Sequence, residues 1–198
     1  MVSVKVFTAD GRGSVGSVLA GLNYMLQEIE TKRDVAMVAN LSFGTPVGIN
    51  IFRIVLEALI SKNVTVTASA GNEASDACRK LPGSIDGVLT IGASTVNDEV
   101  AKFSNMGPCI DLFAPGDRIT SAWRSANFDR ATLSGTSQSS AFAAGVAALL
   151  LELDPSMEPF KVKDFLYDSA ETDSLSGILD SANTLNLLLN MGGLELTT

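Results

Sequence analysis

The sequence predicts an α/β fold in three layers, with a mainly parallel sheet covered by helices on both faces. Short segments rich in β-branched residues alternate with longer segments whose apolar residues recur at helical spacing. The short segments are apolar throughout rather than at every second position, which is typical of strands buried on both faces. Of the 198 residues, 46% are hydrophobic and 18% are charged, so one globular domain with a sizeable core is expected.

The expected elements follow one another in a regular order. They are a strand at residues 2–7, a helix at 15–32, a strand at 35–41, a helix at 51–59, strands at 64–68 and 87–93, a helix at 137–153 and a short helix at 160–166. The segment 137–153 is dominated by small and apolar residues on every face, which predicts a helix buried on all sides.

A glycine-rich segment, Gly11-Arg12-Gly13-Ser14-Val15-Gly16, lies between the first expected strand and the first helix. It fits the pattern G-x-G-x-x-G of dinucleotide-binding turns, which also require an acidic residue at the end of the second strand. Asp34 lies at about the right distance but precedes that strand. A simple strand-to-helix turn is therefore favoured, and a nucleotide-binding α/β domain is the alternative.

The composition argues against several classes of partner and chemistry. The net charge of −8 and the pI near 4.5 make nucleic acid and anionic membrane surfaces unexpected partners. No apolar segment is long enough to span a bilayer, and residues 1–5 lack the layout of a signal peptide. The chain contains no histidine, which excludes a histidine acid, base or metal ligand from these residues.

Ser137 stands at the expected start of the long apolar helix. In the first turn of a helix the backbone N–H groups lack intrahelical partners, and the helix dipole favours negative charge. A serine at this place can act as a nucleophile whose own N–H holds the oxyanion that forms. The alternative, from the local sequence alone, is an ordinary helix cap.

The segment Gly135-Thr136-Ser137, with Ala144-Gly145-Val146-Ala147-Ala148-Leu149 after it, resembles the nucleophile segment of subtilisin-like serine proteases, the subtilases. The rest of the chain agrees in order and spacing, with features of the proteinase K and aqualysin branch. The resemblance implies a subtilisin-like fold and a serine endopeptidase that acts on polypeptides and requires no cofactor. Two departures are Gln138, where the family commonly has Met, and Ala141-Phe142, where it usually has Pro-His.

Two more segments follow expected strands, at the carboxyl ends where parallel sheets bind ligands. Asn72 by itself is compatible with a turn residue, but Ala70-Gly71-Asn72 resembles the subtilase oxyanion segment. The resemblance implies that the Asn72 side chain is the second oxyanion donor, beside the Ser137 N–H. The residues implied to bind the substrate peptide, in part by pairing with its backbone, are Ser42, Phe43, Gly44, Ser69, Ala70 and Gly71.

Two cysteines and one aspartate complete the candidate residues. Cys78 and Cys109 are too few for a disulfide scaffold, and free buried thiols are one interpretation. The resemblance to aqualysin-like proteases implies a Cys78–Cys109 disulfide and hence secretion of the intact parent protein. It also implies a structural calcium ion held by Asp111 and the carbonyl groups of Val88 and Asp86. The alternative is that Asp111 is a hydrogen-bonded structural residue.

The resemblance covers only the C-terminal two-thirds of a subtilase catalytic domain. In the family the catalytic Asp and His precede the strand expected at residues 2–7, so residues 1–198 are expected to form a partial peptidase domain without them. Ser137 without a base stays protonated, and the chain alone should be nearly inactive. Exposed apolar surface is expected where the missing segment would pack.

Three hypotheses about function follow. The chain is a piece of a secreted subtilisin-like endopeptidase, with the missing N-terminal segment or a propeptide as a partner. Alternatively, it is a non-catalytic subtilase-like protein that binds peptides or a partner. The third hypothesis is the nucleotide-binding domain built on the glycine-rich turn.

Overall fold

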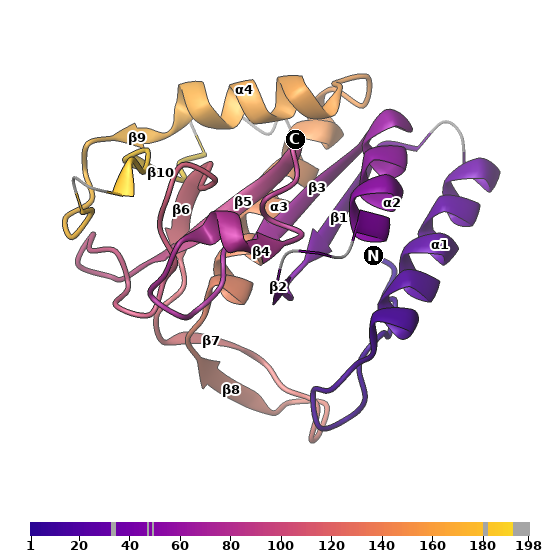
Figure 1. Ribbon diagram of the computed structural model, residues 1–198, viewed down its shortest axis with the longest axis horizontal. Helices are drawn as coiled ribbons and strands as arrows, with labels where there is room; N and C mark the ends of the chain where they lie inside the picture. The colour runs from indigo at the N-terminus through magenta and orange to yellow at the C-terminus, as the bar shows by residue number, and fades with distance from the viewer. Residues whose placement is uncertain (33–34, 47, 49, 180–181, 192–198) are drawn as a thin grey trace.

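The computed structural model describes residues 1–32, 35–46, 48, 50–179 and 182–191, and a parallel sheet forms its centre (Figure 1). Among these residues the sheet has six strands in the order β1-β3-β5-β6-β10-β9. They are β1 (Met37–Leu41), β3 (Val64–Ser69), β5 (Val88–Ser94), β6 (Leu112–Pro115), β10 (Leu187–Leu188) and β9 (Glu171–Thr172). Every pairing is parallel except that of β9 with β10.

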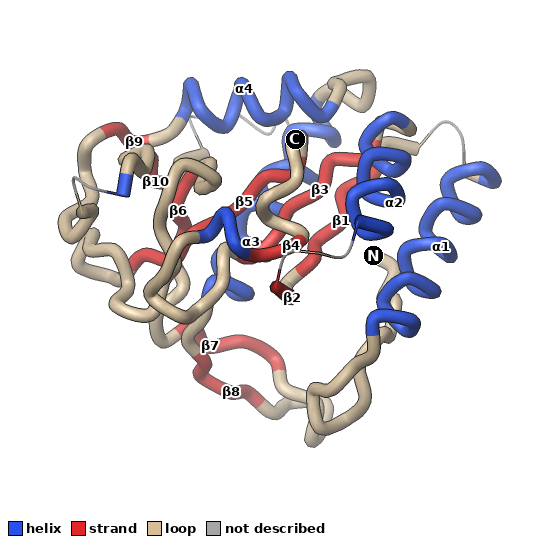
Figure 2. The backbone as a smooth tube through the Cα atoms, in the orientation of Figure 1, coloured by secondary structure: helices blue, strands red, loops and turns tan. Residues whose placement is uncertain are grey.

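Helices cover both faces of this sheet, which confirms the three-layer α/β prediction (Figure 2). On one face α1 (Val15–Thr31) and α2 (Asn50–Ser61) pack on β1 and β3. On the other face α3 (Thr136–Leu153) packs across β1, β3, β5 and β6, and α4 (Pro159–Ser169) packs on the same apolar cluster. The described helices include none that is long and apolar enough to cross a bilayer.

Shorter elements decorate the sheet. The strand β2 (Thr45–Pro46) pairs with β4 (Lys80–Leu81), directly after the short 3-10 helix η1 (Ala77–Arg79). The strands β7 (Ile119–Ala122) and β8 (Arg130–Leu133) form an antiparallel hairpin that leads into α3. In Figure 1 this hairpin projects from the body of the molecule below the sheet.

The expected elements are confirmed with two exceptions, and the first is the strand at residues 2–7. This segment forms no strand in the described structure. Its side chains pack on α1 instead, where a Cβ added at Gly21 would collide with Val6. A β-branched segment becomes a strand only when a neighbour completes its hydrogen bonds, and β1 pairs only with β3 among the described residues.

The second exception is α3, which the sequence predicts to be buried on all faces. Ala143, Ala147 and Leu150 are buried against the sheet, but Phe142 keeps 45% of its surface exposed. Ala141, Gly145 and Ala148 are exposed along the same side of the helix. The apolar composition was read correctly, but no described element covers this face, so the prediction of complete burial is wrong.

The glycine-rich segment forms a turn and a helix cap. Gly11 has φ +78°, a conformation that favours glycine, and the Thr8 N–H donates to the Arg12 carbonyl at 2.8 Å to close the turn. The Ser14 hydroxyl accepts from the Ser17 N–H at 3.0 Å and caps α1. The segment is thus accounted for as the simple turn favoured from the sequence, although no strand precedes it.

Candidate active site

Ser137 is the second residue of α3, and its hydroxyl is held by the end of β1. The Ser137 Oγ donates to the carbonyl of Ser42 at 3.0 Å, and the Ser42 Oγ donates back to the Ser137 carbonyl at 2.9 Å. Ser140 joins this contact, since its Oγ donates to Asn40 Oδ1 at 2.8 Å. The first turn of α3 is therefore fastened to the carboxyl end of β1, with Ser137 half-buried at the junction.

Asn72 lies just beyond β3 and contacts the residue next to Ser137. Its Oδ1 accepts from both the backbone N–H and the Oγ1 of Thr136, each at 2.9 Å. With the oxygen engaged in this way, the Nδ2 group keeps its two N–H donors for another acceptor. The structure thus brings the predicted nucleophile and the predicted second donor to the same end of α3.

Thr136 is a site residue that sequence reasoning missed. It is fully buried, and its Oγ1 accepts from the Gly71 N–H at 3.1 Å while donating to Asn72 Oδ1. One hydroxyl therefore fixes both the loop that carries Asn72 and the orientation of its amide. The only signal in the sequence was that a threonine directly precedes the candidate nucleophile. A threonine at that place is explained equally well as a helix cap.

The predicted substrate-binding residues form two adjacent segments. The Ser69 Oγ donates to the Phe43 carbonyl at 3.3 Å, which places the segment of Ser42, Phe43 and Gly44 beside the one formed by Ser69, Ala70 and Gly71. Both segments leave the carboxyl ends of neighbouring parallel strands, β1 and β3. Gly44 is exposed and Phe43 is partly exposed, which is compatible with a segment that pairs with a peptide.

Asn105 supports this loop and was also missed from the sequence. It is fully buried, and its Oδ1 accepts from the N–H groups of Glu73 and Ser75 at 3.1 and 3.0 Å. Its Nδ2 donates to the Ala70 carbonyl at 2.9 Å. Gly71 has φ +103°, and a Cβ there would collide with the Asn105 amide, so only glycine fits. The buried Asn105 side chain thereby holds the loop around Asn72 in place.

Charge next to Asn72 is balanced. Lys80 Nζ lies 2.7 Å from Glu73 Oε1, and this hydrogen bond is the largest of the effects that lower the pKa of Glu73. The pair is partly exposed, so its contribution to stability is small. The carboxylate next to the exposed Asn72 is therefore ionised, and the Lys80 ammonium balances its charge.

Cys78 and Cys109 form a disulfide with a Cα–Cα distance of 5.2 Å, which confirms the predicted pairing. The bond joins η1 to the segment just before β6. On the η1 side, Asp76 Oδ1 accepts from the Cys78 N–H at 2.9 Å, and the Ala77 N–H donates to the Met106 carbonyl at 2.7 Å. The disulfide therefore reinforces the stretch that contains Asn105.

Asp111 is buried away from Ser137, against α4. Its Oδ2 accepts from the Thr90 N–H at 2.6 Å. Its Oδ1 accepts from the Tyr167 hydroxyl at 2.6 Å and lies 2.5 Å from Lys163 Nζ. Burial, followed by the adjacent carboxylate, raises the pKa of Tyr167, so this phenol stays a neutral donor. Val88 begins β5, directly after the exposed Asp86 and Gly87.

The arrangement at α3 offers a nucleophile and oxyanion donors, but the chain contains no histidine to act as the base. A hydroxyl, the first-turn N–H groups of a helix and a carboxamide all lie near the start of α3, which suits the formation of a tetrahedral oxyanion. The Ser137 proton is donated to a carbonyl, and the chain has no histidine to accept it.

Comparison with known proteins identifies the family. The sequence model of the subtilase family, Peptidase S8, matches residues 1–190. The chain belongs to the subtilase family. Among solved structures, a cold-adapted subtilisin-like serine proteinase superposes with a TM-score of 0.84 at 34% identity, covering 93% of this chain and 64% of that one. This likeness confirms the subtilisin-like fold.

Two curated relatives show how much of a subtilase is present. The chain is 39% identical to the subtilase-type proteinase psp3 of Schizosaccharomyces pombe, over 93% of its own length and 42% of that protein. It is also 39% identical to the extracellular serine proteinase of Thermus sp. strain Rt41A, over 82% of its length and 38% of that protein. The chain therefore spans about two fifths of the relatives that it matches.

Proposed function

We propose that residues 1–198 form the nucleophile- and oxyanion-bearing part of a subtilisin-like serine endopeptidase. The observation that carries this proposal is the double hydrogen bond of Thr136 to Asn72, which couples the carboxamide to the residue that precedes Ser137. A helix cap alone would give Ser137 no reason to lie beside a second donor on a strand end. Family membership supplies the reaction class.

In the proposed reaction the Ser137 Oγ attacks the carbonyl carbon of a peptide bond. The carbonyl oxygen becomes an oxyanion, held by the Ser137 N–H and the Asn72 Nδ2. The hydroxyl proton passes to a base and then to the leaving amine, and water hydrolyses the acyl-enzyme that remains. Since these residues include no histidine, the base comes from polypeptide outside them, and the chain alone has little activity.

Substrate would lie along the two adjacent loop segments. An extended polypeptide pairs its backbone with the segment of Ser42, Phe43 and Gly44, while the residue before the scissile bond faces Ser69, Ala70 and Gly71. Because this binding depends on hydrogen bonds to the substrate main chain, the preference for particular substrate sequences is weak. The disulfide, and a relative whose name describes it as extracellular, support secretion of the intact protein.

A serine-directed fluorophosphonate probe tests the nucleophile directly. The chain should react slowly, and imidazole added as a substitute base should accelerate labelling in the wild type but not in Ser137→Ala. Peptide mapping by mass spectrometry would place the adduct on Ser137. Equal labelling of the wild type and Ser137→Ala, with or without imidazole, would refute the proposed role.

A second candidate function is peptide or partner binding without catalysis. The observation that favours it is the Ser137 proton, which is donated to the Ser42 carbonyl in a chain without histidine. In that case peptide binding should be unchanged in Ser137→Ala and imidazole should not accelerate labelling. A Gly44→Pro substitution would weaken binding, because Gly44 belongs to the segment expected to pair with the peptide backbone.

A further inference from the structure

The surroundings of Asp111 differ from what a calcium ligand requires. Asp111 keeps only 7% of its surface exposed, and a buried carboxylate must be compensated. Each of its oxygens is engaged: Oδ2 by the Thr90 N–H, and Oδ1 by both Tyr167 and Lys163. The three donors come from β5 and α4. The carboxylate is therefore satisfied by the chain itself.

These residues do not fit a calcium ion. Calcium binds six to eight oxygen ligands at about 2.3–2.6 Å, and it needs an accessible carboxylate. Lys163 Nζ already lies 2.5 Å from Asp111 Oδ1, so a metal at that oxygen would be pressed against an ammonium group.

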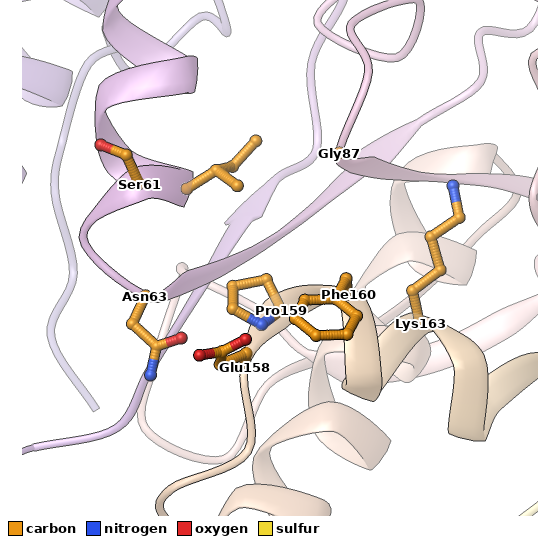
Figure 3. Close-up of a pocket in the computed structure, with 8 residues that line it drawn as sticks. Ser61, Asn63, Gly87, Glu158, Pro159, Phe160 and Lys163 are labelled. Atoms are coloured by element: carbon orange, nitrogen blue, oxygen red, sulfur yellow. The ribbon is translucent and has the colours of Figure 1, made fainter.

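The Lys163 side chain extends from α4 to the place where the resemblance implies a calcium ion. It lines a cavity of about 430 Å³ together with Gly87, the residue between the two carbonyl donors expected from the resemblance, Asp86 and Val88. Figure 3 shows its side chain extending from α4 toward the strand that begins beside Gly87. The Lys163 side chain is 30% exposed, so most of its aliphatic part is covered by neighbouring atoms.

The position of Lys163 on α4 also sets its partners. Tyr167 follows one helical turn later, and Lys163 Nζ lies 5.5 Å from the centroid of its ring. A single helix face thus presents a cation and a hydroxyl to one buried carboxylate. Val162 and Leu166, which directly precede Lys163 and Tyr167 in the sequence, are fully buried on the inner side of the same helix. Docking of α4 therefore delivers the positive charge together with the apolar contacts.

We propose that the Lys163 ammonium is the resident cation of the Asp111 site, and that this subtilase binds no calcium there. The positive charge that a metal would bring is carried covalently on α4. The scaffold around β5 and β6 is then indifferent to calcium and to chelators. This inference concerns the scaffold and holds whether or not Ser137 reacts.

Thermal unfolding with and without calcium tests the proposal. The wild-type Tm should be the same in millimolar calcium and in excess EGTA. Lys163→Met should lower the Tm by about 5 °C, because Asp111 loses its counter-charge, and calcium should then restore part of the loss. Lys163→Arg should stay indifferent to calcium. Lys161→Met, on the same helix but paired with the exposed Phe160, is the matched control.

Terbium luminescence gives a readout specific to this place. The Tyr167 hydroxyl touches Asp111, so a lanthanide bound there would be excited through that ring. In the wild type, terbium emission sensitised by tyrosine should be no stronger than in Asp111→Asn. Lys163→Met should show additional tyrosine-sensitised emission, and the double variant Lys163→Met with Tyr167→Phe should lose that additional emission. Wild-type emission, or a calcium-dependent Tm, that disappears in Asp111→Asn would overturn the proposal. So would a Lys163→Met variant whose Tm equals that of the wild type.

Discussion

The two ends of the sheet differ in how much apolar surface and unpaired strand edge they leave exposed. At β5 and β6 the buried polar side chains of Ser104, Asn105 and Asp111 are all hydrogen-bonded within the chain. At β1 one edge has no partner among the described residues, and Phe142 on α3 and Val35 before β1 are 45% and 59% exposed. The buried polar groups named in the first region have partners within the chain, while the second region presents apolar surface to solvent.

This difference bears on how the site is built. The oxyanion side, with Asn72, Thr136 and Asn105, likewise holds its geometry through contacts within the chain. The matched proteinase has more polypeptide than this chain, which covers 64% of it. Substitutions on the two sides should therefore act differently, through folding stability on one and through association on the other.

The largest expected effect is loss of the disulfide. Replacing both cysteines, as in Cys78→Ala with Cys109→Ala, frees a loop whose ends are 31 residues apart. The chain-entropy relation predicts a loss of about 3–4 kcal/mol in the free energy of unfolding. Urea unfolding followed by circular dichroism measures it, and the wild type in reductant should match the double variant. A loss below about 1 kcal/mol would show that this region is held by its other contacts.

Asn105→Ala should come next, at about 2–3 kcal/mol. The truncation leaves the Glu73 and Ser75 N–H groups and the Ala70 carbonyl without the partner that now satisfies them. Asn97→Ala, on an exposed turn, is the control and should change the unfolding free energy by less than about 0.5 kcal/mol. Equal effects of the two substitutions would contradict the supporting role of Asn105.

Sequence alone predicted the local elements of this region well and its long-range contacts poorly. The strands β3 and β5 follow from short β-branched segments, and the disulfide from a family resemblance. The roles of Asn105 and Thr136 depend on which loops meet in space, and nothing near them in sequence shows this. Lys163 is similar: its spacing places it on α4, but only the packing of α4 on the sheet brings its ammonium to Asp111.

A smaller effect, about 1–2 kcal/mol, is expected for Thr136→Val. The substitution keeps the shape but removes the hydroxyl that accepts from Gly71 and donates to Asn72. The Asn72 amide then keeps only the Thr136 N–H, so labelling of Ser137 by the fluorophosphonate should slow by about tenfold. Thr120→Val, on the exposed hairpin, is the matched control. A stability loss without slower labelling would mean that Thr136 holds the loop but does not orient Asn72.

The errors of sequence reasoning fall at the other end of the sheet. Residues 2–7 have the composition of a strand but lack a neighbouring strand among the described residues. The helix α3 has apolar residues on every face, yet composition does not say what covers each face. Both predictions assumed that other parts of the chain cover β1 and α3. That assumption fails at the exposed apolar surface, which the sequence analysis also expected.

The smallest effect on stability, and the sharpest test of the comparison, is Phe142→Ser. Because Phe142 is 45% exposed, the unfolding free energy should change by less than about 0.5 kcal/mol. Its surroundings, Ala141, Gly145 and Ala148, make a continuous exposed apolar strip, and such surface promotes association. Light scattering should therefore show less self-association in the variant than in the wild type. Phe128→Ser removes a side chain that is 96% exposed on the β7–β8 loop and should leave association unchanged. If both variants reduced it equally, general hydrophobicity rather than the face of α3 would be responsible.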